Sequence, residues 1–103
     1  MKTSEIYCDI NDNWTKSHEF EYLKKTSPKS LFIFPNGEKY ECYGQDAEII
    51  HKLSGIHMHT VSDSRLMQVT AIRKEKLDDT IAALKRLGAD VRIVHVIECT
   101  SEE

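Results

Sequence analysis

The sequence predicts an α+β fold in which a mixed β-sheet is flanked by about three helices. The dipeptide Asn36-Gly37 lies between two strand-like runs and is a strong hairpin signal, which requires an antiparallel pair of strands. Helical stretches join the other strand candidates and so permit parallel crossovers in the same sheet. The element order, α-β-β-α-β-β-α-β, therefore favours one sheet with helices packed on it. A length of 103 residues predicts a single domain over residues 1–103.

Both ends of the chain are polar. Residues 1–13 have only Ile6, Tyr7 and Ile10 as apolar anchors, so they are expected to form an ordered arm or an edge strand. Residues 99–103 are expected to be a frayed tail, because a polar chain end has little to hold it.

The first helix is predicted over residues 15–25. Phe20 and Leu23 supply its buried side, with Trp14 as a further candidate. Pro28 requires the helix to end before it, because the residue preceding a proline is pushed out of the α region.

The predicted hairpin consists of residues 30–34 and residues 38–43. The first run, SLFIF, is apolar on both faces, as a central strand would be. The second run alternates, so that its side chains divide between two faces. One face carries Tyr40 and Cys42, and the other carries Lys39, Glu41 and Tyr43.

A second helix is predicted over residues 46–55. Asp46 is its expected N-cap, and Gly55 can adopt the left-handed conformation of a C-cap. The expected apolar stripe consists of Ile49, Ile50 and Leu53.

The last third of the chain contains two short strands, a helix and a final strand. The short strands are expected at residues 56–61 and 67–72, on either side of a loop at residues 62–64. The helix has the clearest pattern, because its apolar residues recur at core-facing intervals. These residues are Leu77, Ile81, Leu84 and Leu87. Gly88 closes the helix, and residues 90–98 form the final strand.

The charge balance argues against a strong non-specific nucleic-acid binder, since the formal net charge is −3. Basic residues nevertheless form three groups. They are Lys24, Lys25 and Lys29, then Arg65, Arg73, Lys74 and Lys76, and finally Lys85 and Arg86. Two interpretations stay open, namely helix-end electrostatics on a solvated surface or a modest phosphate-contacting face. The second requires Lys39, Arg65 and Arg73 to converge in space.

The cysteines and the absence of long apolar runs indicate a cytoplasmic protein without a membrane partner. Cys8, Cys42 and Cys99 are odd in number and form no C-x-x-C pair, which is typical of reduced thiols in the cytosol. The N-terminus lacks the apolar segment of a signal peptide, and no apolar run is long enough to span a bilayer.

No metal site, cofactor or catalytic residue is predicted. His57 and His59 fall on one face of a strand candidate, a spacing that can chelate a metal. Further candidate ligands are His51, Cys42 and His95. No C-x-x-C or H-x-x-x-H pattern accompanies them, so surface histidines are the expected explanation. No cysteine has a local signature that ties it to a histidine, so the protein is not expected to be an enzyme.

Three stretches of the chain carry a resemblance to a known family. Residues 30–56 hold a strand, the run Gly37-Glu38-Lys39-Tyr40-Glu41, and Gln45-Asp46-Ala47, which opens a helix closed by Ser54-Gly55-Ile56. Residues 77–98 hold a hydrophobic helix that ends in Leu-Gly before an alternating strand, and residues 18–30 fit an opening helix. Together these stretches resemble domain I of the MutS DNA repair proteins, their N-terminal mismatch-recognition domain.

The resemblance implies a MutS domain I-like fold and a DNA-contacting role for the strand at residues 38–43. In that family a phenylalanine of this strand stacks on a mispaired base, and a glutamate two residues later hydrogen-bonds the same base. Glu41 occupies the position of the glutamate, but Lys39 stands where the phenylalanine belongs. Lys39 can contact a phosphate or pair with Glu41, and Tyr43 shares their face as a displaced aromatic. An ATPase is not predicted, because the chain has no G-x-x-x-x-G-K-[ST] motif.

Two functions follow from these observations. The first is a stand-alone, non-enzymatic DNA-binding module that is mismatch-repair-like, with Lys39, Glu41 and Tyr43 as its DNA-binding residues. The second is an adaptor that retains only the fold and binds another protein. Glu41 at the family spacing favours the first function, whereas the missing phenylalanine and the negative net charge favour the second.

Overall fold

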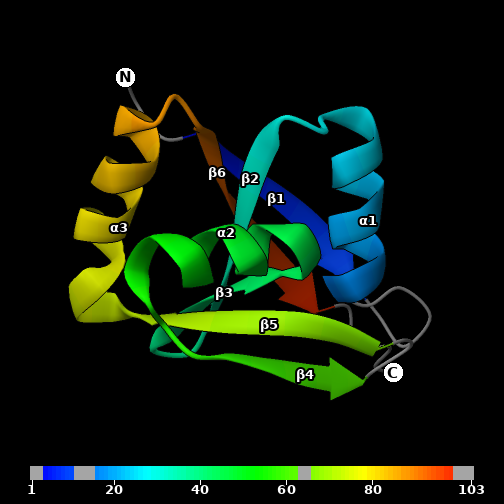
Figure 1. The fold of residues 1–103 in the computed structure, drawn as a ribbon. Coiled ribbons are helices and arrows are strands. Elements are labelled where there is room, and N and C mark those ends of the chain that lie inside the picture. The colour runs from blue at the N-terminus through cyan, green and yellow to red at the C-terminus, as the bar shows by residue number, and fades with distance from the viewer. Residues whose placement is uncertain (1–3, 11–15, 63–65, 99–103) are drawn as a thin grey trace, which may run out of the picture.

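The computed structural model describes residues 4–10, 16–62 and 66–98, which form three helices and a six-stranded mixed sheet (Figure 1). In chain order the elements are β1 (Ser4–Ile10), α1 (Lys16–Thr26), β2 (Ser30–Asn36), β3 (Lys39–Tyr43), α2 (Gly44–Ser54), β4 (Met58–Ser62), β5 (Leu66–Arg73), α3 (Lys74–Arg86) and β6 (Asp90–Glu98). The predicted α+β class and mixed sheet are therefore confirmed. No helix in these residues is long and apolar enough to cross a membrane.

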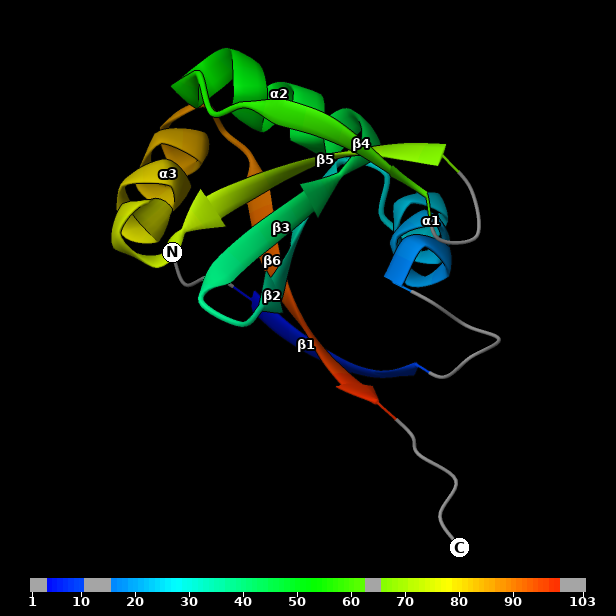
Figure 2. The same cartoon turned by 90° about the horizontal axis from the view of Figure 1, so that it is seen from below.

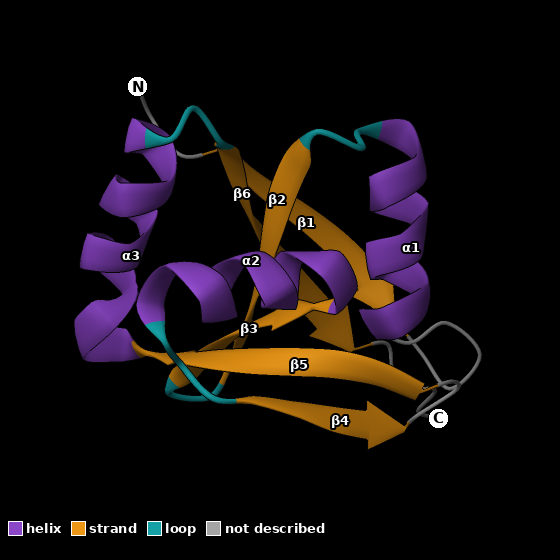
Figure 3. Cartoon of the chain, in the orientation of Figure 1, coloured by secondary structure: helices purple, strands orange, loops and turns teal. Residues whose placement is uncertain are grey.

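The strands lie in the order β1-β6-β2-β3-β5-β4. β6 pairs in parallel with both β1 and β2, whereas the β2–β3, β3–β5 and β5–β4 pairs are antiparallel. The sheet is strongly twisted, so that β4 and β5 run across the direction of β1, β2 and β6 (Figure 3). Of the two alternatives expected for the N-terminal residues, the structure has an edge strand over the described part, β1.

Helices cover both faces of the sheet, and the sheet separates two apolar clusters (Figure 2). The cluster under α1 consists of Phe20, Leu23, Phe32, Phe34, Tyr43, Val69 and Val94. The cluster under α2 and α3 consists of Leu31, Ile33, Cys42, Ile50, Ile72, Leu84 and Val91. β2 contributes to both clusters because its successive side chains point to opposite faces. Its continuous apolar run is thus explained by its place inside the sheet.

The predicted apolar stripes of α2 and α3 each include one residue that the structure leaves exposed. Ile49 faces solvent because Ile50, about 100° further round the helix, is the residue that faces the sheet. Leu87 is 70% exposed because α3 ends at Arg86, so the chain turns away before the last position of the stripe reaches the core. Trp14, expected to help bury the first helix, lies outside the described residues, as do residues 63–65 and 99–103.

Asp46 is not the N-cap that the sequence predicts. α2 begins at Gly44, and its N-cap is the extended residue Tyr43, which makes no capping hydrogen bond with its side chain. Asp46 is the third residue of the helix and is fully buried. Its carboxylate is engaged by other elements, so it is not available to cap its own helix.

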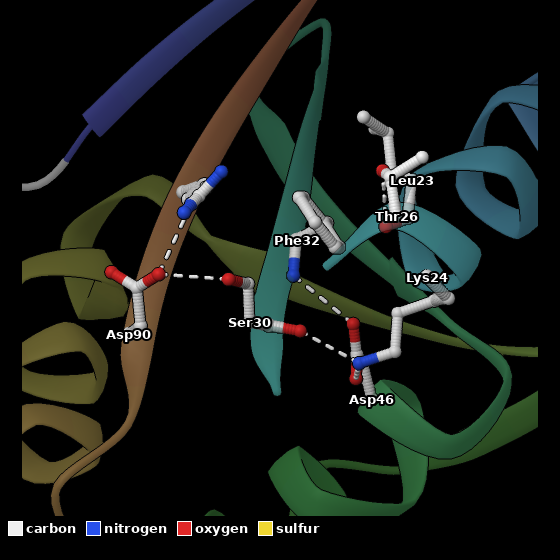
Figure 4. Close-up of polar contacts among 8 residues, drawn as sticks. Leu23, Lys24, Thr26, Ser30, Phe32, Asp46 and Asp90 are labelled. Carbon is white, nitrogen blue, oxygen red and sulfur yellow. Dashed lines mark hydrogen bonds and ion pairs between the residues drawn. The ribbon is translucent and has the colours of Figure 1, made fainter. Parts of the chain in front are cut away.

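The buried carboxylate of Asp46 joins three elements (Figure 4). Oδ2 accepts a hydrogen bond from the backbone N–H of Phe32 at 3.0 Å, and Oδ1 accepts one from Lys24 Nζ at 3.0 Å. Lys24 also donates to the backbone carbonyl of Ser30 at 2.6 Å and lies 5.7 Å from the centroid of the Phe32 ring. The network therefore holds the end of α1 and the start of α2 to the start of β2.

Burial has the largest effect on the pKa of Asp46. It raises the pKa of Asp46 above the ordinary value of 3.8, although the hydrogen bonds from Phe32 and Lys24 act to lower that pKa. Desolvation therefore outweighs the donors. A buried ion pair of this kind contributes little net stability, but removing one partner leaves the other unsatisfied.

We expect Asp46→Ala to lower the free energy of unfolding by about 3–5 kcal/mol, because the largely buried Lys24 ammonium loses its counter-ion and the buried Phe32 N–H loses its acceptor. Urea unfolding measures this loss. Asp78→Ala, at an exposed position of α3, is the matched control and should change stability by less than about 0.5 kcal/mol. Equal losses in the two variants would contradict the structural role of Asp46.

The raised pKa also predicts a pH dependence. The folded protein holds the Asp46 proton more tightly than the unfolded chain does, so this group stabilises the fold less as pH rises from 3.8 through the folded-state pKa. The free energy of unfolding of the wild type minus that of Asp46→Asn should therefore fall over this interval. Urea titrations of both proteins between about pH 4 and about pH 7 measure the difference. A difference that grows with pH would show that the folded-state pKa is lowered.

Candidate nucleic-acid interface

The candidate interface lies at one end of β3, where the β2–β3 turn meets the end of β5 and the start of α3 (Figures 1 and 2). Strand pairing fixes which side chains are neighbours there. Lys39 is paired with Asn36 on one side and with Arg73 on the other. Residues paired across neighbouring strands project from the same face. The three side chains therefore form one row across β2, β3 and β5.

The turn that begins β3 differs by one residue from the predicted turn. The sequence places Asn36 and Gly37 in the turn, whereas in the structure Asn36 is the last residue of β2 and pairs with Lys39. Gly37 and Glu38 then connect the strands, and Gly37 supplies the positive φ of 66°. This register brings the amide of Asn36 to the face that carries Lys39 and Glu41.

Both carboxylate oxygens of Glu41 are held by donors within the hairpin. The Tyr43 hydroxyl donates to Oε1 at 2.6 Å, and Asn36 Nδ2 donates to Oε2 at 3.1 Å. Glu41 is half-buried. A carboxylate fixed in this way has a defined orientation and keeps further lone pairs for a donor on a ligand.

Tyr43 shares the face of Lys39 and Glu41, as predicted, but it lies in the core. It is 5% exposed, and its ring centroid is 5.0 Å from that of Phe34 and 6.0 Å from that of Phe20. The expectation of a displaced aromatic that could stack on a base is therefore wrong, because the helix above it excludes a ligand. Tyr43 instead holds Glu41 through the hydrogen bond from its hydroxyl, whereas Lys39 is exposed.

Basic side chains converge at this end of β3. Lys39, Arg73 and Lys74 line a hollow of about 490 Å³ together with Glu38 and Glu75. A phosphate-contacting face requires such a convergence. Arg65, the expected third member, lies outside the described part of the chain. Lys74 takes the third place in the hollow because α3 starts directly after β5.

The other candidate ligands and nucleophiles are not brought together. No group of three His, Cys, Asp or Glu side chains placed to hold a metal occurs among the described residues. His51 Nδ1 lies 2.7 Å from the carbonyl of Ile56, and His95 Nε2 lies 2.9 Å from Glu5 Oε1. Burial raises the pKa of the Cys42 thiol well above its usual range, and the charges of Asp46 and Glu41 add to this effect. A buried thiol held in its neutral form is a poor nucleophile.

A known family model covers most of the chain. Residues 16–103 match the family model described as MutS domain I, so the chain belongs to this family. No curated protein matches the chain. The matched range includes β3 with Lys39 and Glu41, together with Arg73 and Lys74.

We expect Tyr43→Phe to lower the free energy of unfolding by about 1.5 kcal/mol, because the ring still packs but the hydrogen bond to the charged Glu41 is lost. Asn36→Ala removes the other, exposed hydrogen bond to Glu41 and should cost less than about 1 kcal/mol. Urea unfolding of both variants makes the comparison. A Tyr43→Phe variant no less stable than Asn36→Ala would contradict the role of the Tyr43 hydroxyl.

Proposed function

We propose that this chain is a non-enzymatic DNA-binding module that recognises mismatched DNA through the face carrying Glu41 and Lys39. The observation that carries the proposal is that Tyr43 and Asn36 hold both carboxylate oxygens of Glu41. The resemblance to the family implies that Glu41 takes the place of the base-contacting glutamate. A carboxylate is repelled by DNA phosphates, so a carboxylate with a fixed orientation favours contact with a specific hydrogen-bond donor on a base.

Lys39 stands where the family has its base-stacking phenylalanine, and this substitution changes which interactions can contribute to DNA affinity. Stacking of a base on an aromatic side chain is worth about 1–3 kcal/mol, and Lys39 does not supply it. Lys39 supplies a flexible positive charge for a phosphate instead. With a net charge of −3, the chain binds DNA through a local contact whose affinity is low.

No chemical step is assigned to this module. MutS domain I is a recognition domain without catalytic residues, and the hydrogen bonds of Glu41 to Tyr43 and Asn36 hold the carboxylate in place without linking it to a nucleophile. We accordingly propose neither a cofactor nor a metal for it.

A protein adaptor is the second candidate function, and the edge of the sheet favours it. Among the residues that the structure describes, β4 pairs only with β5, so its outer main-chain groups could accept an added strand. In that case Lys39→Ala would leave partner binding unchanged unless Lys39 lies in the partner surface.

We expect the wild-type protein to bind a mismatched duplex more tightly than a matched duplex or a single strand, and Glu41→Gln to lose about tenfold of that preference, because a charged hydrogen bond to the base becomes a neutral one. Fluorescence anisotropy with the three labelled DNAs at two salt concentrations measures both effects. Lys39→Ala should weaken binding to all three DNAs alike.

Glu48→Gln is the matched control, because it makes the same chemical change on the exposed surface of α2. It should keep the mismatch preference of the wild type. Absence of binding to any of the DNAs at low salt would refute the DNA-binding function. A Glu41→Gln variant with the full mismatch preference would refute the role of Glu41.

A further inference from the structure

We propose that Lys39, Arg73 and Lys74 form a phosphate-binding site for the backbone of the nucleic acid, separate from the base-contacting Glu41. The inference rests on the proposed function and divides its surface into two parts. The three cations anchor a phosphodiester whatever the sequence of the DNA, and Glu41 reads the base.

Strand register places the cations together. Arg73 is the residue of β5 that pairs with Lys39 of β3, and Lys74 follows Arg73 as the first residue of α3. All three line the same hollow. They come from two antiparallel strands and one helix, so their convergence depends on the fold and not on a run of basic residues in the sequence.

Among the described residues, the three cations that line the hollow form no ion pair with a carboxylate. Glu38 and Glu75 line the same hollow, yet within the described residues no ion pair or hydrogen bond joins either glutamate to Lys39, Arg73 or Lys74. The contrast within the same fold is Lys24, which is fixed by Asp46. Side chains without a partner can turn toward an incoming phosphate without first breaking an ion pair.

The chemistry of the three side chains suits a phosphodiester. An arginine guanidinium can donate two parallel hydrogen bonds to phosphate oxygens, and the lysines on either side add point charges. Two glutamates beside three cations leave a small excess of positive charge, which suits one phosphate group better than a dense polyanion.

The phosphate site and the base-contacting Glu41 are separated along β3. Glu41 lies two residues beyond Lys39 on the same face, which is about 7 Å along a strand. Glu41 is paired with Phe34 and Ala71, so its own row contains no cation. A nucleotide whose phosphate is held at the row of Lys39 and Arg73 can therefore direct its base along β3 toward Glu41.

The experiment compares the double variant Arg73→Ala/Lys74→Ala with Lys25→Ala/Lys29→Ala, which removes the same charge from exposed positions near the end of α1. Anisotropy with a labelled duplex is measured over a range of salt concentrations. We expect the first variant to reduce the slope of log K against log salt by about 2 and to weaken matched and mismatched binding equally, by tenfold or more. The control should keep the wild-type slope and affinity.

A wild-type slope in the Arg73→Ala/Lys74→Ala variant, or an equal change in the control, would overturn the phosphate site. Circular dichroism and thermal melting establish that both variants are folded. Titration of the ¹⁵N-labelled protein with inorganic phosphate and with a short single-stranded oligonucleotide tests the site separately from mismatch binding.

Amide shifts at Lys39, Arg73 and Lys74 that the double variant abolishes would support the phosphate site even if no mismatch preference were found. Their absence with both probes would overturn it. Larger shifts with the oligonucleotide than with phosphate support a polynucleotide as the source of the anion, whereas equal shifts would overturn the backbone assignment.

Discussion

The buried carboxylate of Asp46 is the interaction on which the arrangement of this fold depends. It accepts hydrogen bonds from the backbone of β2 and from Lys24 of α1 while belonging to α2 itself. α1 and α2 lie on opposite faces of the sheet, so apolar packing alone would leave their relative position less defined. Burial raises the pKa of Asp46, which shows that desolvation of the carboxylate is costly. The network therefore adds little to the free energy of unfolding, and its main effect is to fix the relative positions of α1, α2 and β2.

The candidate interface takes its geometry from the same strand. β2 is held at its first residues by Asp46, and its last residues, Phe34 and Asn36, pair with Glu41 and Lys39. A slip of one residue in this pairing would send Asn36 and Phe34 to the opposite face. The orientation of Glu41 thus depends on a register that is fixed at both ends of β2.

The sequence predicts most of the fold and only part of the interface. Local signals suffice for the hairpin around Gly37 and for the part of the α3 stripe that lies inside the helix, and the family resemblance is confirmed. They fail where long-range packing decides. From the sequence, Asp46 is predicted to cap its helix and Tyr43 to be exposed. In the structure Asp46 is buried against β2 and α1, and Tyr43 is covered by α1. Asn36 and Lys74 lie near Lys39 because of the pairing of β2, β3 and β5, and this pairing cannot be inferred from the sequence.

Chemical-shift mapping with a mismatched duplex tests the central claim most directly, because it reports where DNA contacts the protein without any substitution. If DNA binds the face that carries Lys39 and Glu41, shifts should concentrate on the β2–β3 turn, on Lys39 to Glu41, and on Arg73 and Lys74, while the outer edge of β4 and the surface of α2 stay unchanged. Shifts centred on β4 or on α1, with none at Glu41, would contradict it and assign the contact to a different face of the domain.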